Sequence, residues 1–269
     1  MRDLGADTAV SGGAGRYSAT LHEGWDIWGP QGGYVAGVAL RAAGELTSFR
    51  RPASFTCHFL RPAQLGSVDV RVESVRQTRR AESLRVTCVQ NEALVLAAIV
   101  WTVDGLAGVD HDAAESPDAP EPAAVQPWEN YLPGGEQPFP FWSNFDVRPV
   151  HPAPDGWARA GAPRFLAWMR LRSLSDHEDP FVDAARMLAM ADSTMFPAAT
   201  LAHEGGFPYI APSLDLTLSF HRVGGTSEWL LVEGVSPLSD GAIVAGAASI
   251  WSSDARLLAS GQQQMLQRN

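Results

Sequence analysis

The sequence contains no lysine. All 20 of its basic residues are arginine, and 30 acidic residues give a net charge of −10. Without lysine, the chain has neither a Schiff-base nucleophile nor the lysine of a phosphate-binding P-loop. The negative charge argues against nucleic acid and anionic membrane surfaces as partners.

Several other features are scarce or absent. The only cysteines, Cys57 and Cys88, lie in apolar, strand-like surroundings, so we expect reduced core residues rather than a disulfide framework. The Gly-x-Ser-x-Gly elbow of serine hydrolases does not occur. No apolar run is long enough to span a bilayer, and residues 1–15 lack the apolar core of a secretory signal. These absences predict a folded cytoplasmic protein.

Two segments predict long helices. Residues 32–48 (GGYVAGVALRAAGELTS) place small and apolar residues on nearly every face, which is typical of a buried helix. Residues 180–195 follow Asp179, a favoured N-cap residue, and Pro180, which suits the first helical position. Both helices are therefore expected to lie in the core.

Four strand-like segments follow each helix. After the first they are residues 54–62, 67–75, 82–90 and 93–103, and after the second residues 213–222, 228–236, 242–251 and 256–266. Residues 141–149 and 164–172 are two further candidate strands. One helix followed by four strands, twice, predicts an α+β fold in which two antiparallel sheets each wrap around a long central helix.

The segment between the repeats has a different composition. Residues 105–138 are rich in proline, alanine and acidic residues, which is typical of a linker. The expected organisation is therefore an N-terminal unit at 1–104, a linker at 105–138 and a C-terminal unit at 139–269.

The repeat is broken at two places. Gly33 lies 21 residues before Ser54, and Asp192 lies 21 residues before Ser213, so a glycine corresponds to a carboxylate. Aligning the last strands pairs Trp101 with Gln263. Core packing gives no reason for such exchanges, and they make the second half the candidate site.

Each candidate has a structural alternative. Asp192 falls on the apolar stripe of its helix, where burying a carboxylate is costly unless it is hydrogen-bonded or takes part in catalysis. The alternative is that Asp192 caps the helix, or that the helix frays near Pro197, so that the side chain points to water. Gln263 has inward strand parity, but Gln262 and Gln264 flank it, so the register is open and a hairpin-end role fits as well.

At this point the chain resembles the acyl-CoA thioesterase II-like double-hotdog proteins, in an actinobacterial-type branch. The segments that carry the resemblance are GPQGGYVAGVALRA, SFTCHFLRPAQLGSVDVRVE, SLDLTLSFHR with EWLLVEGVSPLSDG, and DARLLASGQQQML. It implies a catalytic trio at Asp192, Ser213 and Gln263, with serine where the best-known members have threonine.

The resemblance also bears on the glycine pair before the first helix. Gly32, Gly33 and Tyr34 are expected to form a nest of backbone amides that binds a thioester oxygen or a CoA phosphate. The alternative is that the glycines only let the helix pack closely. Arginines 50, 51, 76, 79 and 80 are either contacts for CoA phosphates or simply exposed side chains.

The implied reaction is hydrolysis of an acyl-CoA thioester, with Asp192 as general base toward a water that Ser213 and Gln263 position. No metal and no cofactor are expected, because SDHEDP (175–180) and DHD (110–112) are better explained as solvated segments. Two alternative functions remain. One is a hotdog enoyl-CoA hydratase, which needs an aspartate and a histidine a few residues apart at the start of the helix, whereas this chain has no histidine between Asp26 and His58. The other is a non-catalytic acyl-CoA-binding protein. A homo-oligomer is possible.

Overall fold

Both expected long helices are present in the computed structural model, which describes residues 1–105, 107–152, 161–203 and 209–268. Helix α2 spans Gly32–Leu46 and helix α3 spans Pro180–Thr200, which runs five residues past the expected end and continues through Pro197. Asp179 caps α3, because its carboxylate accepts a 2.7 Å hydrogen bond from the Phe181 amide. The capping prediction is therefore confirmed.

The strands largely follow the expected segments. In the first half they are β3 (Arg51–Phe59), β4 (Gly66–Gln77), β5 (Ala81–Gln90) and β6 (Ala93–Val103). In the second half they are β7 (Phe145–Pro149), β8 (Arg164–Leu171), β9 (Asp215–Phe220), β10 (Leu230–Asp240), β11 (Ile243–Ser252) and β12 (Leu257–Leu266). The expected strand at 141–149 begins only at Phe145, because Pro140–Asn144 forms the 3-10 helix η5.

The N-terminal elements were not predicted from the sequence. They are α1 (Leu4–Asp7), β1 (Ser11–Gly13), β2 (Arg16–Leu21) and the 3-10 helix η1 (Glu23–Trp25). With β1 and β2 included, each half consists of two strands, a long helix and four strands.

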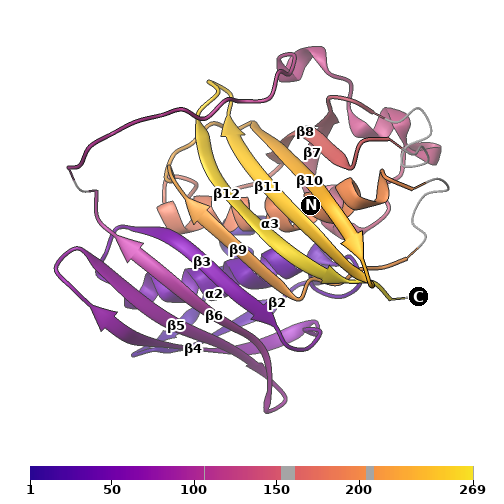
Figure 1. Ribbon diagram of the computed structural model, residues 1–269. Helices are drawn as coiled ribbons and strands as arrows, with labels where there is room; N and C mark the ends of the chain where they lie inside the picture. The colour runs from indigo at the N-terminus through magenta and orange to yellow at the C-terminus, as the bar shows by residue number, and fades with distance from the viewer. Residues whose placement is uncertain (106, 153–160, 204–208, 269) are drawn as a thin grey trace.

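The prediction of two separate sheets is wrong. The strands form one 12-stranded sheet in the order β1-β2-β4-β5-β6-β3-β9-β12-β11-β10-β8-β7, in which every pair is antiparallel. Strands β3 and β9 join the halves side by side at the centre of Figure 1. An unpaired edge strand exposes a row of backbone groups, and pairing β3 with β9 removes one such edge from each half.

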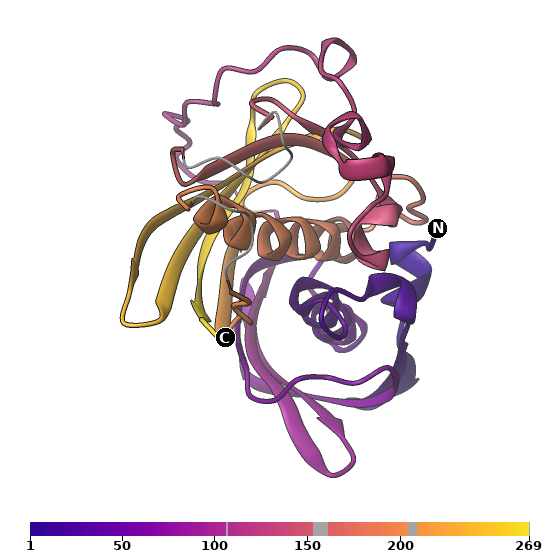
Figure 2. The same ribbon diagram turned by 90° about the vertical axis from the view of Figure 1, so that its right-hand side faces the viewer.

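The strand order is the same on both sides of this join when read outward from β3 and from β9. The two halves are therefore related by a pseudo-twofold axis that passes near the β3–β9 pair. Figure 2 shows the sheet of the first half curving around α2, while α3 lies along the inner face of the second half.

The two helices pack directly against each other, because glycines of α2 face α3. A Cβ atom on Gly33 would lie 2.3 Å from the Leu188 backbone oxygen, and one on Gly44 would lie 2.8 Å from the Phe181 ring. Gly37 faces Ala185 in the same way. The two helices are thus antiparallel along this contact, with residues 33 to 44 of α2 packed against residues 188 to 181 of α3. They can approach this closely because the α2 glycines have no side chains.

The segment between the halves contains no α-helix or strand among its described residues, which exclude 106. It forms the 3-10 helices η2 (Pro122–Ala124), η3 (Trp128–Tyr131) and η4 (Pro133–Gly135). Trp128 and Leu132 pack into the main core, so this segment is not merely a solvated tether. Nowhere in the described ranges is a helix long and apolar enough to cross a membrane.

Candidate active site

Asp192 lies in the middle of α3 and is almost fully buried, with 8% of its surface exposed. Its Oδ2 accepts hydrogen bonds from Gln31 Nε2 at 2.7 Å and from the Gly33 amide at 2.9 Å. Its Oδ1 accepts one from Ser213 Oγ at 2.8 Å. The alternative in which Asp192 frays into water is therefore excluded.

Ser213 reaches Asp192 because it lies just before β9 begins, where the chain joins the sheet by a single bridge to Met265. Its counterpart Ser54 lies inside β3, in regular pairing with Trp101 and Ser219. The two serines correspond in sequence, yet only Ser213 bonds to a carboxylate.

The surroundings of Asp192 affect its ionisation in two directions. Burial raises the pKa of the carboxyl above its ordinary value, whereas the hydrogen bonds from Ser213 and the Gly33 amide lower it. Cys57 faces this carboxylate from β3. The pKa of its thiol lies well above the ordinary value, mainly because of burial and further because of the Asp192 charge. Cys57 is therefore a neutral thiol and a poor nucleophile.

The glycine stretch is used differently from the expected nest. The Gly33 amide donates to Asp192, and the Tyr34 amide donates to Gln31 Oε1 at 2.7 Å. The Tyr34 side chain is fully buried, and its single hydroxyl proton is shared between the backbone oxygens of Asp7 at 3.1 Å and Thr20 at 3.2 Å. Two of the three amides are thus engaged within the protein, and a substrate-binding role for the stretch stays a prediction that centres on Gly32.

Gly32 provides space next to the carboxylate. A Cβ atom here would lie 3.0 Å from Asp192 Oδ2 and 3.1 Å from the Phe59 ring. Because Gly32 is the first residue of α2 and has no positive φ, backbone strain does not require glycine. A larger residue would instead press on Asp192 and on the Phe59 ring, which would have to move by a few tenths of an ångström.

Gln31 is the site residue that the sequence reading missed, although it lies in the quoted segment GPQGG. It caps α2, is 4% exposed and joins the first half to the carboxylate of the second. Its position directly before the glycine pair was a usable signal, because side chains at a helix N-cap bond to nearby backbone amides.

Gln263 lies on the inner face of β12 and is 2% exposed, while Gln262 and Gln264 are exposed. The register is thereby settled in favour of Gln263 as the inward glutamine. It pairs with Gly246 on β11, where a Cβ atom would lie 2.7 Å from Met195 Cβ, one helical turn beyond Asp192. Neither Nε2 nor Oε1 of Gln263 has a hydrogen-bond partner among the described residues.

The predicted pairing of Trp101 with Gln263 is wrong. Trp101 is 38% exposed and lies on the outer face of β6. The strand register gives Ala98 as the counterpart of Gln263. On β3, Cys57 pairs with Ala98 of β6 on one side and with Leu216 of β9 on the other. Because Thr217 pairs with Gln262, the preceding residue Leu216 lies beside Gln263 of β12. Ala98, Cys57, Leu216 and Gln263 thus form one inward row across the join, with Ala98 in the position that Gln263 occupies on the other side.

Three other buried carboxylates provide a comparison. Asp183 pairs with Arg186, and Asp7 pairs with Arg2 at 2.6 Å. Glu82 is 4% exposed and accepts hydrogen bonds from Thr47 and Ser74. Within the described part of the chain, the partners of Asp192 are all neutral, as are the hydroxyl partners of Glu82, and burial raises the pKa of Asp192.

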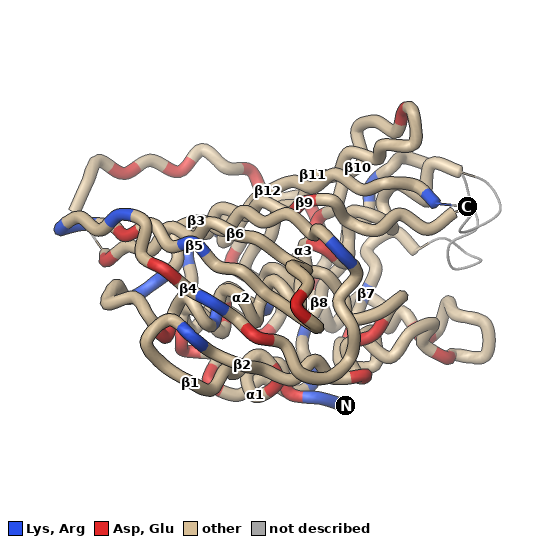
Figure 3. The backbone as a smooth tube through the Cα atoms, turned by 90° about the horizontal axis from the view of Figure 1, so that it is seen from below, with Lys and Arg blue, Asp and Glu red and all other residues tan. Residues whose placement is uncertain are grey.

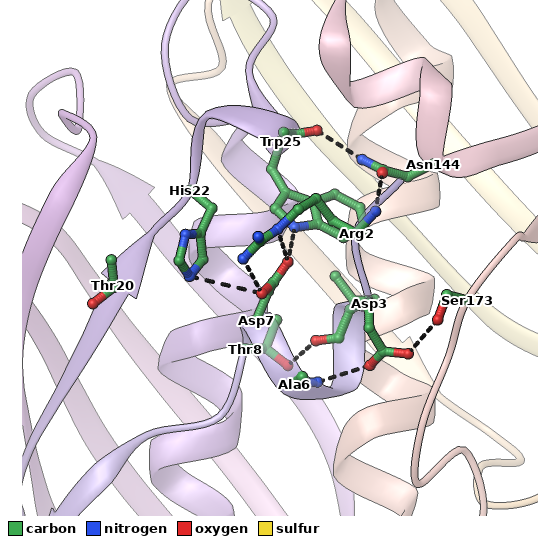
Figure 4. A network of polar contacts seen from close by, with 12 residues as sticks. Arg2, Asp3, Ala6, Asp7, Thr8, Thr20, His22, Trp25, Asn144 and Ser173 are labelled. Atoms are coloured by element: carbon green, nitrogen blue, oxygen red, sulfur yellow. Dashed lines mark hydrogen bonds and ion pairs between the residues drawn. The ribbon is translucent and has the colours of Figure 1, made fainter.

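The Asp7 network anchors the segment that leads to α2 (Figure 4). Asp7 Oδ2 accepts 2.8 Å and 2.9 Å hydrogen bonds from Arg2 Nε and Trp25 Nε1, and the Trp25 backbone oxygen accepts one from the Gln31 amide at 2.9 Å. A hollow of about 500 Å³ beside this network is lined by residues such as Arg2, His22 and Pro140, and by none of the six predicted site residues. The network therefore holds Gln31 in place rather than forming the site.

The five arginines considered for CoA phosphates do not surround Asp192. Arg51 is the first residue of β3 and Phe59, which lies against Gly32, is the last. Because eight residues of strand span about 26 Å, Arg51 lies far from the carboxylate. The β4–β5 hairpin that carries the others except Arg50 lies at the Arg51 end, because Ala81 and Arg51 both pair with Val103. Figure 3 shows basic positions gathered at that end of the sheet.

Several solved structures have the same fold, and their similarity covers nearly the whole chain. A hot dog fold protein of unknown function from Alicyclobacillus acidocaldarius is 20% identical, with a TM-score of 0.85 and coverage of 99% of this chain and 98% of the other. A putative thioesterase II from Thermobifida fusca YX is 20% identical, with a TM-score of 0.82 and coverage of 99% and 97%. An acyl-CoA thioesterase II, TesB2, from Mycobacterium marinum is 23% identical, with a TM-score of 0.79 and coverage of 98% of both chains. These similarities show the hot dog fold.

No curated protein matches the sequence. Two family domains do: the acyl-CoA thioesterase N-terminal domain matches residues 21–103, and the acyl-CoA thioesterase C-terminal domain matches residues 111–267. The second match alone covers more than half of the chain. The chain therefore belongs to the acyl-CoA thioesterase family, and the protein is a thioesterase.

Proposed function

We propose that the protein hydrolyses acyl-CoA thioesters to a carboxylic acid and CoA, with Asp192 as the general base. The observation that carries the proposal is a buried carboxylate whose hydrogen-bond donors, as far as the chain is described, are all neutral, next to the space left by Gly32. An arginine partner would stabilise the anion and make it a weaker base. Asp192 has none among the described residues, in contrast to Asp7 and Asp183.

The hydrogen bonds select the oxygen that takes the proton. A carboxylate oxygen has about two lone-pair sites. Those of Oδ2 are filled by Gln31 and the Gly33 amide, whereas Oδ1 accepts only the Ser213 hydroxyl among the described residues. Oδ1 therefore keeps an open site for an attacking water.

In the proposed reaction, the water oxygen bonds to the thioester carbonyl carbon as its proton passes to Asp192 Oδ1. The tetrahedral intermediate then collapses, the C–S bond breaks, and the CoA thiolate leaves and receives that proton. The amide of Gly32, at the N-terminus of α2, is the proposed donor to the oxyanion. This sequence balances without a redox partner.

Gln263 is proposed to position the water together with Ser213. This buried amide has no partner in the described part of the chain, and such a group carries a desolvation cost that is relieved when water or substrate hydrogen-bonds to it. Its inward side chain lies on the sheet below the turn of α3 that carries Asp192 and Met195. Substrate or water near Oδ1 is the natural partner for this amide.

Asp192→Asn tests the proposal, with Glu82→Gln as matched control. Asparagine keeps the size and can bond to Gln31, Gly33 and Ser213, but it cannot take the proton, so kcat should fall about 100- to 10,000-fold with KM little changed. Glu82→Gln removes a similarly buried carboxylate and should leave kcat unchanged. Release of CoA from acyl-CoA esters of several chain lengths, followed by thiol detection, measures both.

A folded Asp192→Asn protein that hydrolyses every acyl-CoA at the parental rate would overturn the mechanism. The division at residues 104 and 139 and a cytoplasmic location remain part of the proposal. Assembly into a homo-oligomer also remains open to measurement by sedimentation.

A further inference from the structure

The orientation of the Gln31 side-chain amide is fixed by its neighbours. Oε1 accepts a hydrogen bond from the Tyr34 backbone amide, which can only donate. The NH2 group must then point the other way, where it meets Asp192 Oδ2 at 2.7 Å and the Ala189 backbone oxygen at 3.3 Å. All three neighbours require the same orientation, so this amide cannot flip without losing each bond.

The fixed amide determines how Asp192 is presented. Without Gln31, one lone pair of Oδ2 would be buried and free, and either oxygen could take a proton. We propose that Gln31 is a positioning residue that fills this lone pair, stabilises the carboxylate form and thereby confines proton transfer to Oδ1. The inference rests on the proposed role of Asp192 as the base.

The choice of residue at the N-cap supports a role beyond capping. Serine, threonine, aspartate and asparagine are the favoured N-cap residues, because a short side chain reaches the amide two or three residues on. Glutamine satisfies the same amide here and is long enough to reach α3 with its other end. A shorter cap would serve α2 equally well and leave Asp192 without this donor.

Among the described residues, the groups that share the surroundings of Asp192 are neutral side chains and backbone amides. Gln31 and Gly33 face it from α2, Ser213 from before β9, and β12 contributes the neutral Gln263. Cys57 faces it from β3, and burial keeps its thiol pKa well above the ordinary value. Asp215, the first residue of β9, has its Oδ1 turned to a different partner, because it accepts a 2.8 Å hydrogen bond from the Gln264 backbone amide. The acid limb of the rate profile should therefore report Asp192.

The test compares Gln31→Ser and Gln31→Glu with the parent protein in the pH dependence of kcat/KM for an acyl-CoA ester. Gln31→Ser keeps a capping oxygen and removes the donor to Asp192, so the acid limb should move up by about one pH unit. Gln31→Glu keeps the reach but places a second carboxyl against Asp192, so the limb should move up further. In both variants the loss of rate should be largest at low pH.

Asp179→Ser is the matched control, because it exchanges the N-cap of α3 without touching Asp192. Its acid limb should not move. If Gln31→Ser melts at the parental temperature and shows an unmoved acid limb while Asp192→Asn is inactive, Gln31 is only a cap and this inference is wrong. If Asp192→Asn is active, the proposed function itself fails, which is a different result.

Discussion

The first half of the molecule presents Gly33 and Ala98 where the second half presents Asp192 and Gln263. The strand order around the β3–β9 join is the same on both sides, and a long helix lies inside each half. Yet the Gly33 amide directly contacts the carboxylate of its sequence counterpart, Asp192. Two equivalent positions touch only where they lie close to the axis that relates them.

This contact explains why the two halves differ. Equivalent side chains beside a twofold axis compete for one volume, and here a Cβ atom on Gly33 would already lie 2.3 Å from the Leu188 backbone oxygen. One position must be empty for the other to carry a carboxylate. The first half therefore supplies backbone amide and Gln31, while the second supplies the proposed base, and the two halves together form one site.

After Asp192→Asn, the largest loss of kcat is expected when Ser213 of the second half is replaced, whereas replacing its counterpart Ser54 in the first half should have no effect. Ser213→Ala removes the donor to Asp192 Oδ1 and should lower kcat about 10- to 100-fold, because positioning of the water is shared with Gln263. Ser54→Ala changes the corresponding residue of β3, which does not contact the carboxylate, and should leave kcat unchanged. Steady-state assays on the same acyl-CoA ester compare the two.

A different outcome would change the chemistry. If Ser213→Ala is as inactive as Asp192→Asn, and the parent protein yields an acyl-enzyme that hydroxylamine traps, Ser213 is the nucleophile and the water mechanism is wrong. Equal losses in Ser213→Ala and Ser54→Ala would instead contradict the asymmetry between the halves.

The next effect separates the three adjacent glutamines. Gln263→Leu removes a buried amide that has no partner among the residues described, so kcat should fall about tenfold while stability is kept or increased, since an unsatisfied buried polar group is costly. Gln264→Ala changes an exposed neighbour and should alter neither. Assays of CoA release and urea unfolding measure both quantities, and a loss of rate in Gln264→Ala alone would contradict the assignment.

The sequence predicted both long helices, ten of the twelve strands and the inward position of Asp192, because periodicity and capping are local. It did not predict the single sheet, since the pairing of β3 with β9 joins residues about 160 positions apart. It also paired Gln263 with Trp101, because a slip in alignment is invisible until burial shows that the two residues face opposite sides. Gln31 escaped because its role depends on the distance to another helix.

The smallest expected effect concerns the stability of the half that carries the carboxylate. Burial raises the pKa of Asp192 in the folded state above its ordinary value of 3.8, and each unit of such a difference corresponds to about 1.4 kcal/mol. Below the ordinary value the carboxyl is protonated in both states. As pH rises, Asp192 ionises first in the unfolded state. The free energy of unfolding therefore falls as the pH rises from the unfolded-state pKa to the folded-state pKa, and above that it falls no further.

Asp192→Asn removes this dependence. Its free energy of unfolding should match that of the parent near pH 4 and exceed it increasingly toward pH 7, where the parent must keep a charge buried. Urea unfolding at several pH values measures the difference, with Glu82→Gln as control because Glu82 lies in the other half. A difference that stays constant from pH 4 to pH 7 would mean that Asp192 ionises as easily in the folded protein as in the unfolded chain. The hydrogen bonds from Gln31, Gly33 and Ser213 would then fully offset its burial.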